Sequence, residues 1–336
     1  MHIEIIIFFL SIISLNIFII FKIQKLSKIV NIFDKPDQFL KKHKFNIPLI
    51  GGIILAFNIV MIFLLNFFLD VKLITINVSI KHSISILFFL IAFFFLGLFD
   101  DRFGIKPERK IILSILFSII VLSVNDNLLI TDLNFSFYKN KLYLNDFSYL
   151  FTIFCIIILI NAINFYDGIN GQSIIFFIIC FSYLAYSSPA LIFYLSIILI
   201  LTFILFLNLS GKLFMGDSGI YLAGSILIIS LIYEYNQIKS IMYADAIFLL
   251  LLIPGYDLVR LSVSRILNGK NAFYGDRNHI HHLLLNKFSL MKTNIILVLL
   301  LVIPILLFTF VKLNFFIVLM FITITYILLI FTIKSR

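Results

Sequence analysis

The sequence predicts an all-α polytopic integral membrane protein that crosses the bilayer about eleven times. Of its 336 residues, 62% are hydrophobic and only 12% are charged, whereas a soluble domain keeps about a quarter of its residues charged. The apolar runs are also long, because residues 50–69 and 295–311 contain no charge at all. A membrane-spanning helix needs about 20 apolar residues. Both observations argue against a hydrophobic soluble helical protein.

Apolar runs that alternate with polar breaks give the order of the spans. The expected spans cover residues 3–21, 50–69, 84–99, 111–124, 149–165, 173–187, 190–209, 219–233, 242–259, 293–311 and 315–333. The first run lacks the basic start and the cleavage site of a signal peptide, so we expect it to remain as a span. Cys155 and Cys180 lie inside apolar runs and are expected to be buried as small hydrophobic residues. Residues 1–336 are expected to form a single membrane domain.

Lys and Arg are distributed unevenly between the two ends of the predicted spans. Six of the 26 basic residues follow even-numbered spans, namely Lys72, Lys81, Lys139, Lys141, Lys239 and Lys312, and the others follow odd-numbered spans. Loops rich in Lys and Arg stay in the cytoplasm. The N-terminus is therefore predicted to be periplasmic and the C-terminus cytoplasmic. The net charge of +10 then follows from this orientation, and no nucleic-acid partner is expected.

The predicted outer loop near residues 128–145 has the pattern of a short hairpin. Apolar residues alternate with polar ones before and after a turn expected at Lys139 and Asn140. This hairpin is predicted to face the periplasm, whereas five polar features are predicted on the cytoplasmic face.

The first polar feature is a pair of adjacent acids, Asp100 and Asp101, at the inner end of the third predicted span. Charges at such positions are costly unless they bind something or are paired. Neighbouring carboxylates repel each other, and a divalent cation relieves that repulsion. The pair therefore indicates a Mg²⁺ site in which one acid faces the metal, because successive helical residues point about 100° apart. An interfacial ion pair with Arg102 is the alternative.

The second feature lies at the inner end of the fifth predicted span. Asn161, Asn164 and Asp167 follow one another at intervals of three residues, which places them on one helical face. Gly168 and Gly171 then allow close backbone approach and an unwound turn. Such side chains can hydrogen-bond a base, a ribose or a phosphate. Hydrogen bonding between neighbouring helices is the alternative.

The third feature is Asp217, which lies between two glycines where the eighth predicted span begins. An acid at this place is a good helix N-cap. The functional alternative is that Asp217 binds a metal while the helix N-terminus helps to hold phosphate.

The fourth feature is the polar loop that follows the ninth predicted span. It contains Asp257, Arg260, Arg265, Asp276, Arg277, His279, His281 and His282. A zinc site is disfavoured because no cysteine accompanies the histidines and their spacing is not that of a helical zinc motif. Imidazole and guanidinium groups suit a diphosphate better, because they donate charge-assisted hydrogen bonds. A solvated loop that only carries orienting positive charge is the alternative.

The fifth feature is the first cytoplasmic loop, with Lys41, Lys42 and His43. Its lysines suit an anionic lipid head as well as they suit an orientation signal. Carboxylates for Mg²⁺, an Asn/Asp/Gly turn and a His/Arg loop on one face together indicate a site for a nucleotide diphosphate. Its position at the membrane surface indicates a lipid as second substrate. Phosphoryl transfer needs mainly positioning and charge neutralisation, which these groups supply.

Four ordered motifs resemble those of the polyprenyl-phosphate N-acetylhexosamine-1-phosphate transferases of glycosyltransferase family 4. They are FDDR at 99–102, NAINFYDGINGQ at 161–172, FMGDSG at 214–219 and DRNHIHH at 276–282, preceded by DKPD at 34–37 and IPLIGG at 47–52. The resemblance implies that a prenyl phosphate oxygen attacks the β-phosphorus of a UDP-sugar, giving prenyl-diphosphate-sugar and UMP. It covers essentially the whole chain and extends to the number of spans.

The resemblance also implies the surroundings of this reaction. It indicates a bacterial cytoplasmic (inner) membrane with the active site on the cytoplasmic face, and Mg²⁺, or Mn²⁺ as an alternative, as the cofactor. The expected partners are undecaprenyl phosphate and a UDP-N-acetylhexosamine, with N-acetylglucosamine as the expected sugar and a lipid-linked cell-surface glycan as the product's use. A homodimer is compatible with this interpretation.

Residue roles follow by position in the motifs. The resemblance implies catalytic roles for Asp100, Asp101 and Asp167, metal binding by Asp101 and Asp217, substrate binding by Asn161, Asn164, Asn170, Arg277, His279, His281 and His282, and supporting roles for Asp276, Arg265 and His43. Whether Asp100 or Asp101 deprotonates the prenyl phosphate is left open, and that phosphate is largely ionised near neutral pH.

The chain departs from the family pattern at two places. Many members have Asp where this chain has Asn170 and Leu where it has Gln172, which alters hydrogen bonding if this position contacts uracil. The N-terminal motif is also one residue longer before His43. The sequence His279–His282 favours the branch that starts O-antigen or teichoic acid synthesis over phospho-N-acetylmuramoyl-pentapeptide transfer. A transporter is the alternative of another class, but its polar groups should lie near mid-membrane.

Overall fold

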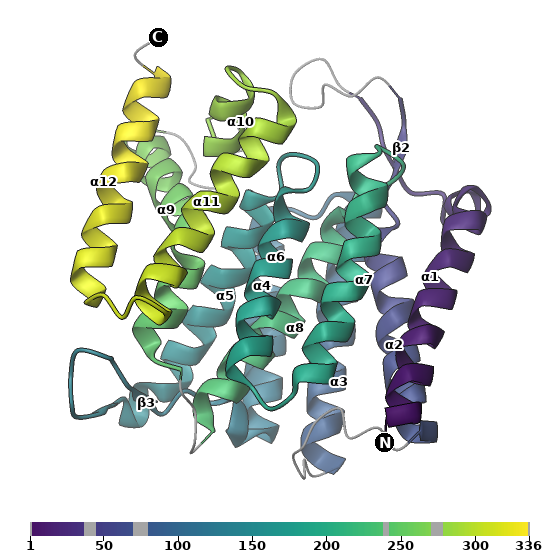
Figure 1. The fold of residues 1–336 in the computed structure, drawn as a ribbon, viewed down its shortest axis with the longest axis horizontal. Coiled ribbons are helices and arrows are strands. Elements are labelled where there is room, and N and C mark those ends of the chain that lie inside the picture. The colour runs from purple at the N-terminus through teal and green to yellow at the C-terminus, as the bar shows by residue number, and fades with distance from the viewer. Residues whose placement is uncertain (1, 37–44, 70–79, 238–241, 270–277, 335–336) are drawn as a thin grey trace.

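The computed structural model describes residues 2–36, 45–69, 80–237, 242–269 and 278–334. Each of the eleven expected spans corresponds to a helix (Figure 1). These helices are α1 (His2–Val30), α2 (Gly51–Leu69), α3 (Ile80–Phe103), α4 (Pro107–Val124), α5 (Ser148–Tyr166), α6 (Gln172–Ser187), α7 (Leu191–Leu209), α8 (Gly216–Asn236), α9 (Ala244–Leu267), α11 (Leu290–Thr309) and α12 (Phe315–Lys334). A short helix, α10 (Ile280–Leu285), lies in the segment between α9 and α11 that carries His279, His281 and His282 and is called the histidine loop below.

Within the described residues, nine helices are long and apolar enough to cross a membrane. The other two long helices are α4, whose first turn carries Glu108, Arg109 and Lys110, and α6, which has 16 residues. The all-α multi-span fold predicted from composition is therefore confirmed. Which end of each helix faces the cytoplasm stays a prediction.

Helix α8 lies at the centre of the bundle, and 78% of its apolar 18-residue stretch is buried inside the protein. It packs against α2, α3, α5 and α6. Two glycines allow the closest approach, because a Cβ on Gly52 would lie 2.3 Å from the backbone nitrogen of Gly219, and one on Gly97 would lie 2.3 Å from the carbonyl oxygen of Asp217. Small residues let membrane helices pack backbone to backbone. The N-terminal turn of α8 is thereby fixed between α2 and α3.

Short strand pairs mark the two ends of the bundle. The predicted hairpin is confirmed as β3 (Asp132–Leu133) paired antiparallel with β4 (Leu142–Tyr143). At the opposite end, β1 (Phe33–Asp34) pairs with β2 (Ile47–Pro48), and Leu49 bridges to Phe214 just before α8. β2, α10 and the C-terminus share this end, whereas the N-terminus lies at the β3 end (Figure 1).

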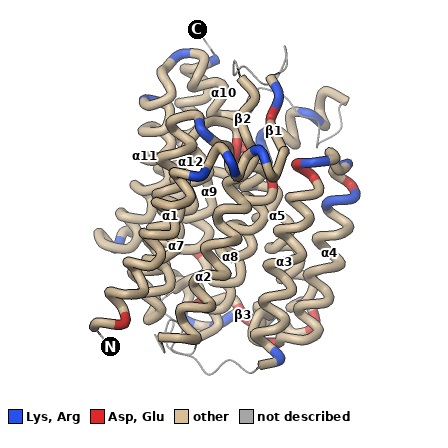
Figure 2. Tube along the Cα trace, turned by 90° about the vertical axis from the view of Figure 1, so that its right-hand side faces the viewer, with Lys and Arg blue, Asp and Glu red and all other residues tan. Residues whose placement is uncertain are grey.

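The basic residues of the described chain gather mainly at the end that carries the C-terminus, as Figure 2 shows. This distribution is the one expected if that end lies in the cytoplasm.

Candidate functional site

A cavity of about 640 Å³ lies at the basic end of the bundle. Its polar wall contains Asp34, Asp100, Asp101, Asp167, Asn170, Asn208, Asp217 and His282, and its apolar wall contains Phe33, Leu49, Phe214, Met215, Leu285 and Leu290. The fold therefore brings six of the predicted site residues to one space. That space offers both a charged surface and an apolar one.

Lys110 lies between two acids of the cavity. Its Nζ is 2.5 Å from Asp100 Oδ2 and 3.6 Å from Asp217 Oδ2. The backbone N–H of Ile105 donates to Asp100 Oδ1 at 2.6 Å. The cationic partner of Asp100 is thus Lys110 at the start of α4, in place of the Arg102 considered from the sequence. Sequence reasoning missed Lys110, although a lysine directly before the predicted span 111–124 was a usable signal.

Asp101 caps the N-terminus of α8 from α3. Its Oδ1 accepts a hydrogen bond from the backbone N–H of Asp217 at 2.7 Å, and its Oδ2 accepts one from Ser218 at 2.9 Å. A carboxylate is favoured there because the first N–H groups of a helix have no partner within the helix. Gly216, with φ of 70°, makes room, since a Cβ would lie 2.7 Å from Asp101 Oδ2. The alternative that Asp217 caps its own helix is wrong.

The three polar residues predicted on one face of the fifth span have different surroundings. Asn164 Nδ2 donates to Asp217 Oδ1 at 3.1 Å. Asn161 Nδ2 donates at 2.7 Å to a carbonyl one turn earlier in its own helix, and it does not line the cavity. Because α5 ends at Tyr166, Asp167 lies beyond the helix, so the three side chains do not continue along one face as expected.

Asp167 lines the cavity from the turn between α5 and α6. Ser173 Oγ donates to its Oδ1 at 2.5 Å. Burial raises the pKa of Asp167 to about 6; the hydrogen bond from Ser173 opposes this shift, and the charge of Asp101 adds to it. The carboxylate form still predominates at neutral pH.

The turn that follows Asp167 needs its glycines, as the sequence predicted. A Cβ on Gly168 would lie 1.8 Å from His281 Nε2, and Gly171 has φ of 87°. Asn208 Oδ1 accepts the N–H of Gly171 at 2.6 Å, and the backbone carbonyl of Asn208 accepts Asn170 Nδ2 at 3.2 Å. An aspartate could not donate this last bond. The departure at Asn170 therefore has a structural use within the chain.

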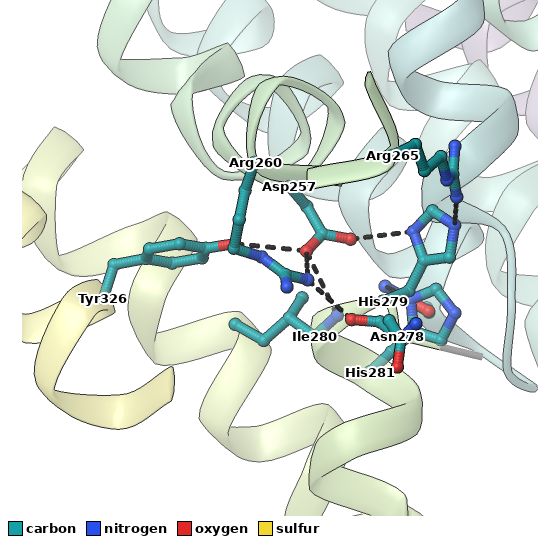
Figure 3. A network of polar contacts seen from close by, with 9 residues as sticks. Asp257, Arg260, Arg265, Asn278, His279, Ile280, His281 and Tyr326 are labelled. Carbon is teal, nitrogen blue, oxygen red and sulfur yellow. Dashed lines mark hydrogen bonds and ion pairs between the residues drawn. The ribbon is translucent and has the colours of Figure 1, made fainter. Parts of the chain in front are cut away.

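The histidines of the loop differ in exposure. His282 lines the cavity. His281 is completely buried, and its Nδ1 lies 3.2 Å from Gln172 Nε2. His279 is also buried, with its Nδ1 2.9 Å from Asp257 Oδ2 (Figure 3). Of the three histidines predicted to hold phosphates, only His282 is on the wall of the cavity.

Asp257, His279 and His281 offer three buried ligand atoms within 4.8 Å of one another. Among the described residues this is a group that could hold a metal ion. However, Asp257 already accepts hydrogen bonds from Arg260 at 2.6 Å and from Tyr326 at 3.1 Å. A guanidinium in contact with the carboxylate repels a further cation. The geometry favours a hydrogen-bond network.

The acids of the cavity suit a metal better. Asp100, Asp101, Asp167 and Asp217 line one cavity, and carboxylate oxygens are the ligands that Mg²⁺ and Mn²⁺ prefer. The ammonium group of Lys110 lies between two of these acids, but one ammonium cannot balance four carboxylates, whereas Arg260 balances the single carboxylate of Asp257. The donor set and its need for positive charge both fit a hard divalent cation.

Several predicted residues are not on the cavity wall. Arg265 is 4% exposed, and its guanidinium carbon lies 5.6 Å from the ring centroid of Phe165. His43, Asp276 and Arg277 lie outside the residues that the structure describes. Besides Lys110, sequence reasoning gave no role to Asn208 or Ser173, and nothing in their local patterns singles them out.

Comparison with known proteins identifies the family. The model of glycosyl transferase family 4 matches residues 83–234. The undecaprenyl-phosphate alpha-N-acetylglucosaminyl 1-phosphate transferase of Escherichia coli K12 is 30% identical over 290 residues, covering 82% of this chain and 75% of the relative. The protein of the same name from Salmonella typhi is 31% identical over 291 residues, with the same coverage. A probable undecaprenyl-phosphate N-acetylglucosaminyl 1-phosphate transferase of Bacillus subtilis is 29% identical over 56% of this chain and 54% of its own length. This multi-span membrane protein is therefore an enzyme that belongs to glycosyl transferase family 4.

Proposed function

We propose that the enzyme transfers N-acetylhexosamine-1-phosphate from a UDP-sugar to undecaprenyl phosphate and releases UMP, with N-acetylglucosamine as the expected sugar. One observation carries the proposal: five carboxylates and a histidine share one cavity with an apolar wall at the end of a membrane bundle. Such a cavity suits a reaction between a charged nucleotide-sugar and a lipid phosphate. The names of the relatives give undecaprenyl phosphate as the acceptor and N-acetylglucosaminyl 1-phosphate as the transferred group.

The proposed reaction forms one P–O bond and breaks another. An oxygen of the prenyl phosphate attacks the β-phosphorus of the UDP-sugar. The bond from that phosphorus to the oxygen bridging to the α-phosphate breaks, and UMP leaves with the electron pair. Because the prenyl phosphate is largely ionised near pH 7, the reaction needs no dedicated base. Positioning and charge neutralisation carry most of the catalysis.

The acids of the cavity are proposed to hold Mg²⁺, which would neutralise charge on the diphosphate when bound. Asp217 is the principal candidate ligand, because Asn164 and the N-terminal turn of α8 fix its position. Asp100 contributes charge from α3, where Lys110 orients it. Asp101 acts mainly by holding the start of α8.

We infer that the basic end of the bundle faces the cytoplasm of a bacterial inner membrane, where UDP-sugars are made. The lipid phosphate would reach the cavity from the bilayer, and the product would start a lipid-linked cell-surface glycan. A transporter is disfavoured by the family and by the position of the acids at helix ends rather than at mid-membrane.

The test is UMP release by the full-length protein in nanodiscs with undecaprenyl phosphate, Mg²⁺ and a panel of UDP-sugars that includes UDP-N-acetylglucosamine and UDP-N-acetylmuramoyl-pentapeptide. We expect turnover with an N-acetylhexosamine donor and its loss on adding EDTA. Release only from the muramoyl-pentapeptide donor would assign the other branch. No release from any donor by a thermally stable preparation would overturn the proposal.

A charge-matched pair of variants tests the role of the acids. Asp217→Asn should lower kcat about 100-fold or more, because several kcal/mol of charge stabilisation depend on the metal site. Asp146→Asn removes an exposed carboxylate in the 3₁₀-helix η2 (Asn145–Phe147) and should keep full activity. Equal rates for both variants would exclude Asp217 from the reaction.

A further inference from the structure

Asp257 of α9 is the centre of a buried polar network (Figure 3). Its Oδ1 accepts hydrogen bonds from Arg260 at 2.6 Å, from Tyr326 of α12 at 3.1 Å and from the backbone N–H of Ile280 at 3.1 Å. Its Oδ2 faces His279 Nδ1 at 2.9 Å. All of these partners converge on one carboxylate that does not itself line the cavity.

The network holds the backbone on both sides of His279. Arg260 donates to the carbonyl of Asn278 at 2.7 Å, while Asp257 accepts the N–H of Ile280. The three consecutive residues 278–280 are therefore attached to one turn of α9. This attachment fixes where α10 begins and in which direction the following histidines point.

The network also selects the tautomer of His279. The Nε2 of its ring lies 3.4 Å from Arg265 NH2, and a guanidinium has donors only. An ionised carboxylate can only accept, so Nδ1 of His279 carries a proton and donates a hydrogen bond to Asp257, which leaves Nε2 facing Arg265. A carboxylate accepts this bond without change, whereas an amide in its place would present either a donor or a weaker acceptor.

Ring contacts connect this buried network to the cavity. The ring of His279 stacks on His281 with centroids 5.2 Å apart and an interplanar angle of 11°. His281 in turn meets His282 edge to face at 4.3 Å, and His282 lines the cavity. His279 also stacks on Phe165 of α5, with ring centroids 5.9 Å apart. The position of His282 thus depends on rings that Asp257 orients.

We propose that Asp257 is a positioning residue for the binding of the donor's diphosphate, acting through His279 and the ring stack that ends at His282. This inference rests on the proposed function for the identity of the donor. Helix α12 also contributes to this network, because its Tyr326 donates a hydrogen bond to Asp257. Asp257 would thus shape the part of the cavity wall formed by His282 without contacting the substrate itself.

The competing explanation is that Asp257 only fastens α9 to α12. The chain offers a matched control for it, because Tyr256 and Thr323 form a second hydrogen bond between the same two helices, 2.5 Å long. The ring of Tyr256 also lies 5.5 Å from that of Tyr326, a contact that phenylalanine keeps. Tyr256→Phe removes a bond between these helices and leaves Asp257 intact. Tyr326→Phe removes one bond to Asp257 and keeps its charge.

The experiment compares Asp257→Asn, Tyr326→Phe and Tyr256→Phe with the wild type, each as full-length protein in nanodiscs. Steady-state UMP release gives kcat and the KM of each substrate, and calorimetric titration with UDP gives a binding readout independent of turnover. We expect Asp257→Asn to raise the KM for the UDP-sugar and the Kd for UDP roughly tenfold or more. The KM for undecaprenyl phosphate should stay within about twofold. Tyr326→Phe should shift the same two constants in the same direction by less, and Tyr256→Phe should shift neither.

The outcomes separate this inference from the proposed function. Wild-type KM and Kd in Asp257→Asn would overturn the inference, and so would equal changes in all three variants that follow their thermal midpoints. If Asp257→Asn does not fold, unchanged constants in Tyr326→Phe decide against it. If the wild type releases no UMP, the proposed function fails, while UDP titration still tests whether Asp257 positions a diphosphate site.

Discussion

The ammonium group of Lys110 lies between Asp100 and Asp217, and its charge offsets part of the repulsion among the acids of the cavity. The side chain of Lys110 is 17% exposed and that of Asp100 is 7% exposed, whereas that of Asp217 is 32% exposed. Such a charge is costly to remove because the remaining acids lose a fixed counter-ion.

Replacing Lys110 by Met should therefore make the protein depend more strongly on Mg²⁺. In EDTA we expect a loss of about 2 kcal/mol of stability, measured as a lower thermal midpoint, and recovery of most of it when Mg²⁺ is added. Lys106→Met changes an exposed lysine four residues earlier and should behave like the wild type. Equal midpoints for Lys110→Met and the wild type in EDTA would contradict this role.

The carboxyl group of Asp167 should determine the pH below which kcat/KM for UMP release falls, that is, the acidic limb of its pH profile. Its pKa is raised to about 6, mainly by burial, so its ionised form is lost as pH falls through about 6. If that form serves catalysis, kcat/KM for UMP release should fall below pH 6. Ser173 donates to the carboxylate and lowers its pKa; Ser173→Ala should therefore move the limb to higher pH.

The control for the limb is Ser182→Ala in the same helix, α6, where the exposed hydroxyl donates only to a carbonyl of its own helix. Its profile should coincide with that of the wild type. A limb that does not move in Ser173→Ala would assign it to another group.

Residue roles within the histidine loop were the least predictable part of the site. His279, His281 and His282 look alike in sequence, yet the structure directs only His282 to the cavity and turns the others toward Asp257 and Gln172. The difference depends on Asp257 of α9, 22 residues before His279, and on Gln172 of α6, 109 residues before His281. Local pattern carries no information about those contacts.

At the scale of elements, the meeting of α3 and α8 builds the acidic side of the cavity. Asp101 at the end of α3 accepts the first N–H groups of α8, although 116 residues separate it from Asp217. The spans and the hairpin could be predicted because their signals are local apolar runs and alternation. The cap could not, because an N-cap is expected next to its own helix, and this one comes from another.

The α3–α8 contact predicts a specific effect of adding one methyl group. A Cβ on Gly97 would lie 2.3 Å from the carbonyl oxygen of Asp217 and 2.6 Å from Ser218 Cα. Because both are backbone atoms, the helices would have to separate. Gly97→Ala should cost about 1–3 kcal/mol and should abolish UMP release by displacing Asp101 from α8.

A glycine in open space provides the comparison. A Cβ on Gly255 of α9 meets nothing within 4 Å, and alanine is a better helix former than glycine. Gly255→Ala should therefore keep the thermal midpoint at or slightly above that of the wild type, with full activity. Wild-type activity in Gly97→Ala would mean that the close approach of α3 and α8 is not required.

At the scale of the whole molecule, one asymmetry connects orientation with chemistry. The basic residues gather at the end of the bundle that carries the C-terminus (Figure 2), and the acidic cavity lies at this same end. The hairpin β3–β4 and the N-terminus lie at the other. If the basic end is cytoplasmic, a cytosolic nucleotide-sugar can reach the cavity directly, while a lipid phosphate arrives from the adjacent leaflet.

This orientation can be tested with single cysteines at exposed lysines of the two ends. Lys212 lies between α7 and α8, at the end of the bundle that contains the cavity, and Lys139 lies in the loop between β3 and β4. In a background with Cys155 and Cys180 replaced by Ala, a membrane-impermeant maleimide added to intact spheroplasts should label Lys139→Cys at once. Lys212→Cys should react only after the membrane is permeabilised. The reverse pattern would put the cavity on the side without UDP-sugars, and the proposed reaction would then lack its donor.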